Sequence, residues 1–199
     1  MSESSYPLLI ALGANLPNGT TPPAQTLALA LRDLAAAGIG PLVTSRFYAT
    51  PCFPAGAGPD YVNAAVAAPM PAGLSPADIL ALLHRIEADH GRTRETRWGM
   101  RSLDLDLVAC GATVLPDAAT QAHWRGLPPD DQRRFAPDGL ILPHPRLQDR
   151  AFVLIPLCDI APDWRHPLTG QTIAAMAAAL PPEDRAEVRP LPDGFSACQ

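Results

Sequence analysis

The order in which apolar patterns follow one another along the chain is the feature that most constrains its fold. Four short apolar segments have the composition and length of β-strands, at residues 7–16, 42–51, 61–68 and from Leu103 onward. Two longer segments, 21–38 and 75–91, repeat apolar residues with helical spacing. The chain order is therefore strand, helix, strand, strand, helix, strand. This order predicts an α+β fold with a ferredoxin-like βαββαβ core, in which the helices pack on one face of an antiparallel sheet.

Local signals predict where the two helices begin and end. In the first, Thr21 precedes two prolines that suit an opening turn, and Gly38 ends the pattern. In the second, Ser75 is followed by Pro76 and, three residues after the serine, by Asp78. This spacing is typical of a capping box, in which the two side chains bond each other's backbone N–H groups. We therefore expect N-caps at Thr21 and Ser75.

The 199 residues fit a single domain with decorations. The core spans about 6–165, interrupted at about 112–139 by a polar, proline-rich insertion in which a short helix is expected around residues 118–124. An extension, 166–199, carries a last helix within 170–184 and a tail from Arg185 that we expect to be weakly ordered. Phe152, in the segment before this extension, is read as lying at a strand start.

Composition excludes several classes of function. All 15 basic residues are arginines, so there is no lysine for a P-loop, a Schiff base or a protein-kinase site. The net charge of -5 argues against a nucleic-acid partner, and no apolar run is long enough to span a membrane. The four cysteines are widely spaced and the first residues do not resemble a signal peptide. We expect a cytoplasmic protein with reduced thiols, acting as a monomer, with a dimer as the alternative.

Two aspartates lie in the last core strand, in the stretch RWGMRSLDLDL at 97–107. Asp104 and Asp106 are two residues apart, so their carboxylates share one face of the strand and can hold a pair of divalent cations. The alternative is a solvent-exposed strand that happens to be acidic. Four nearby arginines, at 92, 94, 97 and 101, favour the first interpretation, because guanidinium groups bind phosphate oxygens while carboxylates hold the metal.

Two further groups of residues are candidates for binding. Tyr61 and Asn63, together with Phe152, suit a slot in which two rings enclose a flat heterocycle and an amide reads its edge. The alternative is that the rings are core residues and the asparagine serves a turn. His144 lies between two prolines and is followed by Arg150. Chemistry alone assigns no role to this histidine.

Taken together, these segments resemble the 6-hydroxymethyl-7,8-dihydropterin pyrophosphokinase family of folate biosynthesis. The matching stretches are ALGANL, YATP, DYVNAAV, RIEADHGRTR, RWGMRSLDLDL and LPHPRLQDRAFVLIPL, in that order from about Leu9 to Pro162. The resemblance implies the ferredoxin-like fold. It also implies Mg²⁺-dependent transfer of the pyrophosphoryl group of ATP to 6-hydroxymethyl-7,8-dihydropterin, giving AMP and the pterin diphosphate.

The resemblance further implies roles for individual residues. Asp104 and Asp106 correspond to the ligands of two Mg²⁺ ions, and Arg92 and Arg94 to arginines of a loop that closes over the triphosphate. The ATP-binding positions are Glu87, Arg94, Trp98, Arg101, Leu107, His144 and Arg150. The pterin-binding positions are Thr50, Pro51, Tyr61, Asn63, Trp98 and Phe152. Met100, His84 and Cys52 depart from the residues common in the family, and none of them removes a charge that the reaction needs.

Two other interpretations remain open at this point. One is a different two-metal phosphotransferase or nucleotidyl transferase, because ferredoxin-like sheets support many activities. The leaving group separates the three reactions: AMP for pyrophosphoryl transfer, ADP for an ordinary kinase, pyrophosphate for nucleotidyl transfer. The second is an RNA-binding βαββαβ module, which would need exposed aromatic residues and positive charge on its sheet. The acidic chain and its two strand aspartates argue against it.

Overall fold

The computed structural model describes residues 7–52, 58–91 and 101–192. Its core elements follow the predicted order of strands and helices. They are β1 (Leu8–Ala14), α1 (Pro23–Ala36), β2 (Val43–Thr44), β3 (Tyr48–Thr50), β4 (Tyr61–Ala68), α2 (Pro76–Asp89) and β5 (Asp104–Cys110). The later elements are α3 (Ala118–Arg125), α4 (Pro129–Arg134), the 3-10 turn η1 (Leu147–Asp149), α5 (Ala151–Ile160), α6 (Ile173–Ala179), α7 (Pro182–Glu187) and β6 (Arg189–Pro190).

The strands form an antiparallel sheet in the order β5-β1-β4-β3-β6, with β2 also paired to β4. Among the core strands, β5 thus lies beside β1, β1 lies beside β4, and β4 lies beside the predicted second strand, which is formed by β2 and β3. This is the predicted ferredoxin-like arrangement. All seven residues of β1 are buried, as expected of a strand with neighbours on both sides and helices on both faces.

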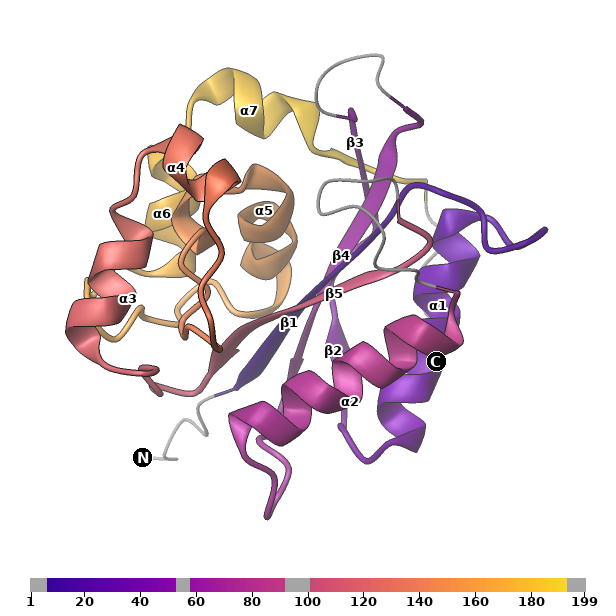
Figure 1. Cartoon of the computed structure of the whole chain (residues 1–199). Helices are drawn as coiled ribbons and strands as arrows, with labels where there is room; N and C mark the ends of the chain where they lie inside the picture. Colours follow the sequence, from indigo (N-terminus) through magenta and orange to yellow (C-terminus); the bar gives the residue numbers. More distant parts are fainter. Residues whose placement is uncertain (1–6, 53–57, 92–100, 193–199) are drawn as a thin grey trace.

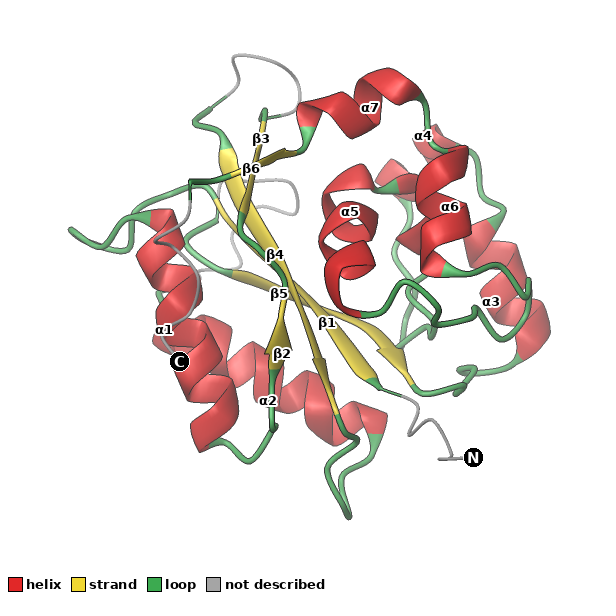
Figure 2. Cartoon of the chain, turned by 180° about the vertical axis from the view of Figure 1, so that it is seen from behind, coloured by secondary structure: helices red, strands yellow, loops and turns green. Residues whose placement is uncertain are grey.

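Helices cover both faces of the sheet (Figures 1 and 2). On one face, α1 and α2 pack on side chains such as Ile10 and Leu105. On the other face, α5 and α6 pack on residues that include Leu9, Ala65 and Val108. The βαββαβ pattern accounts for the first layer alone. The second layer comes from the C-terminal part of the chain, so the prediction that helices lie on one face is incomplete.

The second core helix begins as predicted, and the first begins one residue later. Ser75 caps α2 with a reciprocal capping box to Asp78. The N-cap of α1 is Pro22, without a side-chain bond, and not Thr21. The backbone N–H and carbonyl groups of Thr21 are both bonded to Asn18, which holds the threonine in a turn before the helix.

The predicted strand at 42–51 is interrupted by a β-bulge. Ser45 pairs with Ala65, and Tyr48 pairs with Asn63. The two residues at 46–47 therefore oppose the single residue at 64. The Ser45 hydroxyl oxygen accepts the Ala65 N–H at 2.9 Å, the bond that a backbone carbonyl accepts in a regular ladder. The strand is therefore divided into β2 and β3.

The described part of the C-terminal segment is more ordered than predicted, and residues 193–199 lie outside the described ranges. The expected last helix is divided at Leu180 and Pro181 into α6 and α7, and residues beyond Arg185 continue into β6. Strand β6 pairs with β3, and Val188, 8% exposed, packs in the core beneath α5 and α6. The buried valine, the two ladder pairs and a hydrogen bond from the Leu191 N–H to the Phe47 carbonyl at 2.8 Å hold residues 188–191, whose composition suggested a loose tail.

The remaining predictions concern the insertion and the segment after it. The predicted helix near 118–124 is present as α3, and α4 follows it. Phe152 lies in α5, so its assignment to a strand start is wrong. Pro156 inside this helix is a residue that usually indicates a helix end, which concealed the helical pattern. None of the helices in the described ranges is both long and apolar enough to cross a membrane.

One charged cluster fastens α5 to the sheet. The Tyr48 hydroxyl donates to the Asp159 carboxylate at 2.8 Å, and the Arg46 guanidinium donates to both oxygens of the same carboxylate, at 3.2 and 2.9 Å. Tyr48 is 2% exposed, whereas the Arg46 side chain is 60% exposed. Burial raises the pKa of Tyr48 to about 12, and its hydrogen bond to Asp159 adds to this, so the hydroxyl keeps its proton.

We expect Asp159→Ala to lower the free energy of unfolding by about 2 kcal/mol, because it leaves a buried hydroxyl without its acceptor. Arg46→Ala should lower it by less than about 1 kcal/mol, because water screens an exposed ion pair. Urea unfolding of both variants measures the two losses. A larger loss from the arginine variant would contradict this assignment.

His166 is a second buried polar group, 1% exposed, in the turn between α5 and α6. Its Nδ1 accepts the Leu168 N–H at 3.2 Å, and its ring lies edge-on to Trp164. Burial, and then the positive charge of Arg125, lower the pKa of His166 to about 4. The folded protein therefore keeps this imidazole neutral at a pH where the unfolded chain already binds a proton.

The free energy of unfolding should consequently fall as the pH is lowered from about 6.5 to about 4. Between these values the unfolded state binds the extra proton, and one such histidine contributes a slope of up to about 1.4 kcal/mol per pH unit. His166→Gln should remove this part of the slope, as measured by urea unfolding at several pH values. If the free energy of unfolding of the variant and of the wild type fell equally with pH, His166 would not titrate in this way.

Candidate active site

The two strand aspartates lie on the sheet face covered by α5. Leu105 packs with α1 and α2 and Val108 with α5, so the alternation along β5 places Asp104 and Asp106 on the α5 side. Each carboxylate is half-buried and paired with an arginine: Asp104 with Arg101, and Asp106 with Arg150 at 2.9 Å. The two positive charges offset the repulsion of like charges on one strand face.

Arg101 is held in place by the first strand of the fold. The Arg101 N–H donates to the Asn15 side-chain oxygen at 2.8 Å, and its carbonyl accepts the N–H groups of Asn15 and Leu16 at 3.0 and 3.1 Å. Asn15 is 1% exposed and directly follows β1. The residue at which the chain enters β5 is therefore fixed by the neighbouring strand, and the guanidinium beside Asp104 with it.

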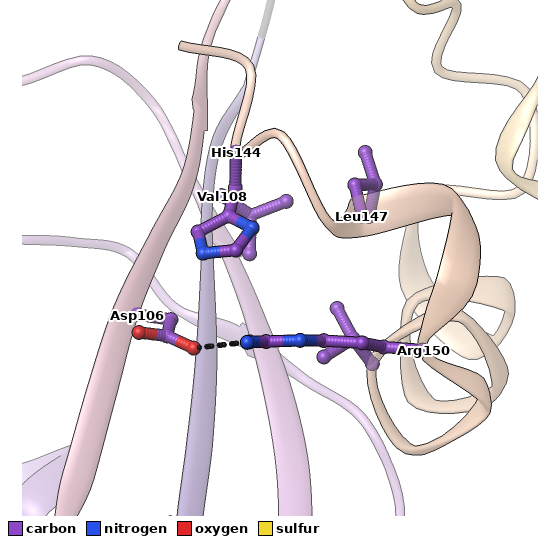
Figure 3. A pocket seen from close by; sticks show the side chains of 6 residues that line it. Asp106, Val108, His144, Leu147 and Arg150 are labelled. Carbon is purple, nitrogen blue, oxygen red and sulfur yellow. Dashed lines mark hydrogen bonds and ion pairs between the residues drawn. The ribbon is translucent and has the colours of Figure 1, made fainter. Parts of the chain in front are cut away.

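A small, shallow hollow lies beside the second aspartate. Asp106 and Val108 of β5 line it together with His144, Leu147, Arg150 and Val153. Figure 3 shows the imidazole of His144 and the guanidinium of Arg150 converging on Asp106 from outside the strand. Arg150 is also the N-cap of α5, so the start of this helix determines where its side chain lies.

His144 is held as a neutral hydrogen-bond donor. Its backbone N–H donates to the Val108 carbonyl at 2.8 Å, and its Nδ1 accepts the Arg146 N–H at 3.1 Å. The second bond places the ring proton on Nε2. Burial, and then the positive charges of Arg150 and Arg146, lower the pKa of His144 to about 3. At neutral pH the ring therefore presents an uncharged Nε2–H.

A second polar group lies across the same sheet face. Asn63 donates from its side-chain amide to the Thr50 hydroxyl at 2.7 Å, and both residues are buried. Asn63 pairs with Gly13 of β1, and Gly13 pairs with Asp104. The aspartate and the asparagine are thus two strands apart, about 10 Å. Gly13 of β1 lies between them on the sheet.

Gly13 is a glycine because of this close approach. A Cβ atom at position 13 would lie 3.1 Å from the Asn63 side-chain oxygen, closer than an ordinary contact. A larger residue here would require the Asn63 amide to shift by a few tenths of an ångström, at the side chain that bonds Thr50. The signal in the sequence was the glycine within an otherwise apolar strand, which often marks a close backbone approach.

The aromatic candidates lie at the rim of this face. Tyr61 pairs with Thr50 on the neighbouring strand and is half-buried. Burial raises the pKa of Tyr61, and the nearby Cys52 and Asp104 add to this while Arg101 opposes it, so the phenol is protonated at neutral pH. Phe152 is 39% exposed in the first turn of α5, with the Arg150 guanidinium 5.7 Å from its ring centre.

Other predicted site residues lie elsewhere or outside the described ranges. The Glu87 carboxylate is buried and accepts the Leu105 N–H at 2.7 Å, at the outer edge of β5. The Leu107 side chain packs in the core under α1 and α2, so only its backbone borders the aspartate face. Pro51 is exposed just after β3. Arg92, Arg94 and Trp98 lie outside the described residues.

The structure shows two further residues that shape the site and that the sequence did not single out. Asn15 positions Arg101, and Gly13 gives Asn63 its space. Both belong to the stretch ALGANL, one of those that carry the family resemblance. A polar residue that directly follows a buried strand is the signal that indicates a structural anchor such as Asn15.

Comparison with known proteins assigns the chain to a family. Residues 9–162 match the profile of the 7,8-dihydro-6-hydroxymethylpterin-pyrophosphokinase family (HPPK). A protein of Synechocystis sp. named 2-amino-4-hydroxy-6-hydroxymethyldihydropteridine pyrophosphokinase is 36% identical over 172 residues, which cover 86% of this chain and 74% of that protein. A protein of Methylorubrum extorquens with the same name is 35% identical, over 87% of this chain and 92% of its own length.

Solved structures with the same fold belong to longer chains. The wild-type HPPK-DHPS of Plasmodium falciparum with SDX-DHP superposes with a TM-score of 0.59 and 13% identity. The match covers 89% of this chain and 45% of that one, so the present chain spans less than half of it. At this identity the superposition shows the fold alone. The profile match and the two relatives show that the chain belongs to the 7,8-dihydro-6-hydroxymethylpterin-pyrophosphokinase family.

Proposed function

We propose that this chain transfers the pyrophosphoryl group of ATP to 6-hydroxymethyl-7,8-dihydropterin, giving AMP and the pterin diphosphate, with two Mg²⁺ ions. Family membership supports the reaction type. The observation that carries the proposal is one sheet face with two arginine-paired carboxylates on β5 and a buried amide–hydroxyl pair on β4 and β3. The first group suits a metal–polyphosphate, and the second suits the polar edge of a heterocycle.

The aspartate pair fits magnesium. Carboxylate oxygens are hard donors, and Mg²⁺ is typically bound by one or two carboxylates, with water and substrate phosphates completing its shell. In the described ranges no group of three or more His, Cys, Asp or Glu residues could hold a metal alone. Asp104 and Asp106 would therefore hold the ions jointly with ATP. When bound, these ions would neutralise the charge that the phosphates carry during transfer.

Side chains around Asp106 suit the binding of ATP. Arg150 and Arg101 supply guanidinium groups that form paired bonds to phosphate oxygens. His144 adds an uncharged Nε2–H donor, set by the bond from Arg146. In the proposed complex Arg101 and Arg150 would bond phosphate oxygens, and Mg²⁺ held by Asp104 and Asp106 would supply the positive charge that these carboxylates now receive from the arginines. Arg92, Arg94 and Trp98 remain predicted contributors.

The pterin is proposed to lie over Gly13, between the aspartates and β3. Asn63 and Thr50 would bond its edge, and Tyr61 and Phe152 would stack on its faces. In this pose the hydroxymethyl oxygen faces the ATP phosphates. It attacks the β-phosphorus in line with the bond to the α-phosphate, which breaks and releases AMP, so catalysis consists mainly of positioning and charge neutralisation.

We also propose that the whole chain functions as one pyrophosphokinase unit in the cytoplasm. Elements from both ends of the chain meet on the sheet, since β6 pairs with β3. Cys52, Cys110 and Cys158 are free thiols, which suits a reducing compartment.

The direct test is the identity of the nucleotide formed from ATP, MgCl₂ and 6-hydroxymethyl-7,8-dihydropterin. We expect pterin-dependent AMP, and a rate reduced more than about 100-fold in Asp104→Asn and Asp106→Asn, because each loses a metal ligand. Asp163→Asn, an exposed aspartate after α5, is the matched control and should retain the wild-type rate. ADP, pyrophosphate or pterin-independent turnover would refute the proposal, and full activity in both strand variants would refute the metal assignment.

Gly13→Ala separately tests the proposed position of the pterin over Gly13. The added Cβ would displace the Asn63 amide, so we expect the KM for the pterin to rise about fivefold or more, with the KM for ATP nearly unchanged. Gly139→Ala is the control, because a Cβ there meets nothing within 4 Å. A rise in the KM for ATP alone would place the pterin elsewhere.

A further inference from the structure

The peptide group between Pro143 and His144 is held from both sides. On one side the His144 N–H donates to the Val108 carbonyl at 2.8 Å. On the other side the Pro143 carbonyl accepts a hydrogen bond from the Gln121 side-chain amide at 3.1 Å. Because a peptide group is planar, bonds to its N–H and to its C=O together fix the orientation of the whole plane. The backbone of His144 is thereby set between β5 and α3.

The second of these bonds comes from the insertion. Gln121 lies in α3, which begins at the Asp117 cap, and its side chain is fully buried. Burial of an amide is unfavourable unless it forms hydrogen bonds, and an apolar side chain of similar size would fill the same space without that penalty. The Gln121 Oε1 is buried without a hydrogen-bond partner among the described residues, so the bond from Nε2 to the Pro143 carbonyl is what the glutamine contributes here.

Other backbone N–H and carbonyl groups of residues 142–144 form hydrogen bonds with backbone groups elsewhere. Leu142 exchanges two hydrogen bonds with Leu115, at 2.9 and 3.1 Å, and the His144 carbonyl accepts the Leu147 N–H at 3.0 Å. Pro143 has no N–H of its own to donate. Loss of the Gln121 amide would leave the buried Pro143 carbonyl without this donor, directly before the residue that lines the hollow beside Asp106.

From this geometry we infer that Gln121 is a positioning residue for His144, through which the insertion shapes the nucleotide end of the site. The inference rests on the proposed function, because it takes His144 to be a ligand of ATP. Gln121 itself touches no substrate. It holds the carbonyl side of the peptide that presents the imidazole toward Asp106 and Arg150 (Figure 3).

Gln121→Met in the full chain tests the inference, since methionine matches the length and volume of glutamine but cannot donate. We expect the dissociation constant and the KM for Mg-ATP to rise about fivefold or more, as for loss of a buried hydrogen bond. The KM for the pterin should change less than twofold. A variant that binds Mg-ATP like the wild type overturns the inference. A wild type that binds no ATP contradicts the proposed function instead.

The chain offers a matched control in the same insertion. Gln132 of α4 also donates from a buried side-chain amide to a backbone carbonyl, that of Leu127, at 2.7 Å. Gln132→Met removes a comparable bond without touching residues 142–144, so its Mg-ATP constants should equal those of the wild type. Equal increases in both variants would indicate general loosening of the insertion and would overturn the specific role of Gln121.

Two further measurements separate positioning from stability. In a His144→Ala background, Gln121→Met should have no additional effect on Mg-ATP binding; a full additional effect would show that Gln121 does not act through His144.

The imidazole nitrogen signals of His144 in NMR should shift in Gln121→Met, and unchanged signals overturn the inference whether or not ATP binds. If the methionine variant does not fold, Gln121→Asn, whose shorter amide falls short of Pro143, is measured in its place.

Discussion

The pairing of two strand carboxylates with two arginines is the interaction on which the rest of the site depends. Asp104 and Asp106 lie about 6 to 7 Å apart on one face of an edge strand, where like charges repel. The arginines reach them from different parts of the chain: Arg101 just before β5, and Arg150 at the start of α5. The Arg150 pair therefore also connects β5 to α5, whereas the Arg101 pair is local to the start of β5.

Helix α5 is fastened at both of its ends. Arg150 bonds Asp106 at the first turn, and near the last turn Asp159 accepts bonds from Tyr48 and Arg46 of the bulged strand. The helix thus spans the sheet from β5 to β3, with Ala65 and similar small residues beneath it. Arg150 and Phe152 both lie at the first turn of this helix, so the helix start contributes to the proposed phosphate site and to the proposed pterin site.

Much of the fold and the centre of the site could be predicted from the chain. The order of elements, the capping box at Ser75 and the shared face of Asp104 and Asp106 all follow from local periodicity and spacing. Predictions failed where an interaction distant in sequence overrides the local pattern. A serine hydroxyl that replaces a ladder carbonyl divides the strand at Ser45, and a buried Val188 holds a segment expected to be loose.

The sequence by itself determined the order of the core elements from β1 to β5, which face of the last core strand carries the carboxylates, and which family the chain resembles, because these depend on residue type and spacing. Only the tertiary structure decided which groups meet. It placed Glu87 at the edge of β5 rather than on the aspartate face, supplied Asn15 as the anchor of Arg101, and brought Gln121 to Pro143. Each of these contacts joins residues 18 or more positions apart, and no local pattern specifies how such segments pack.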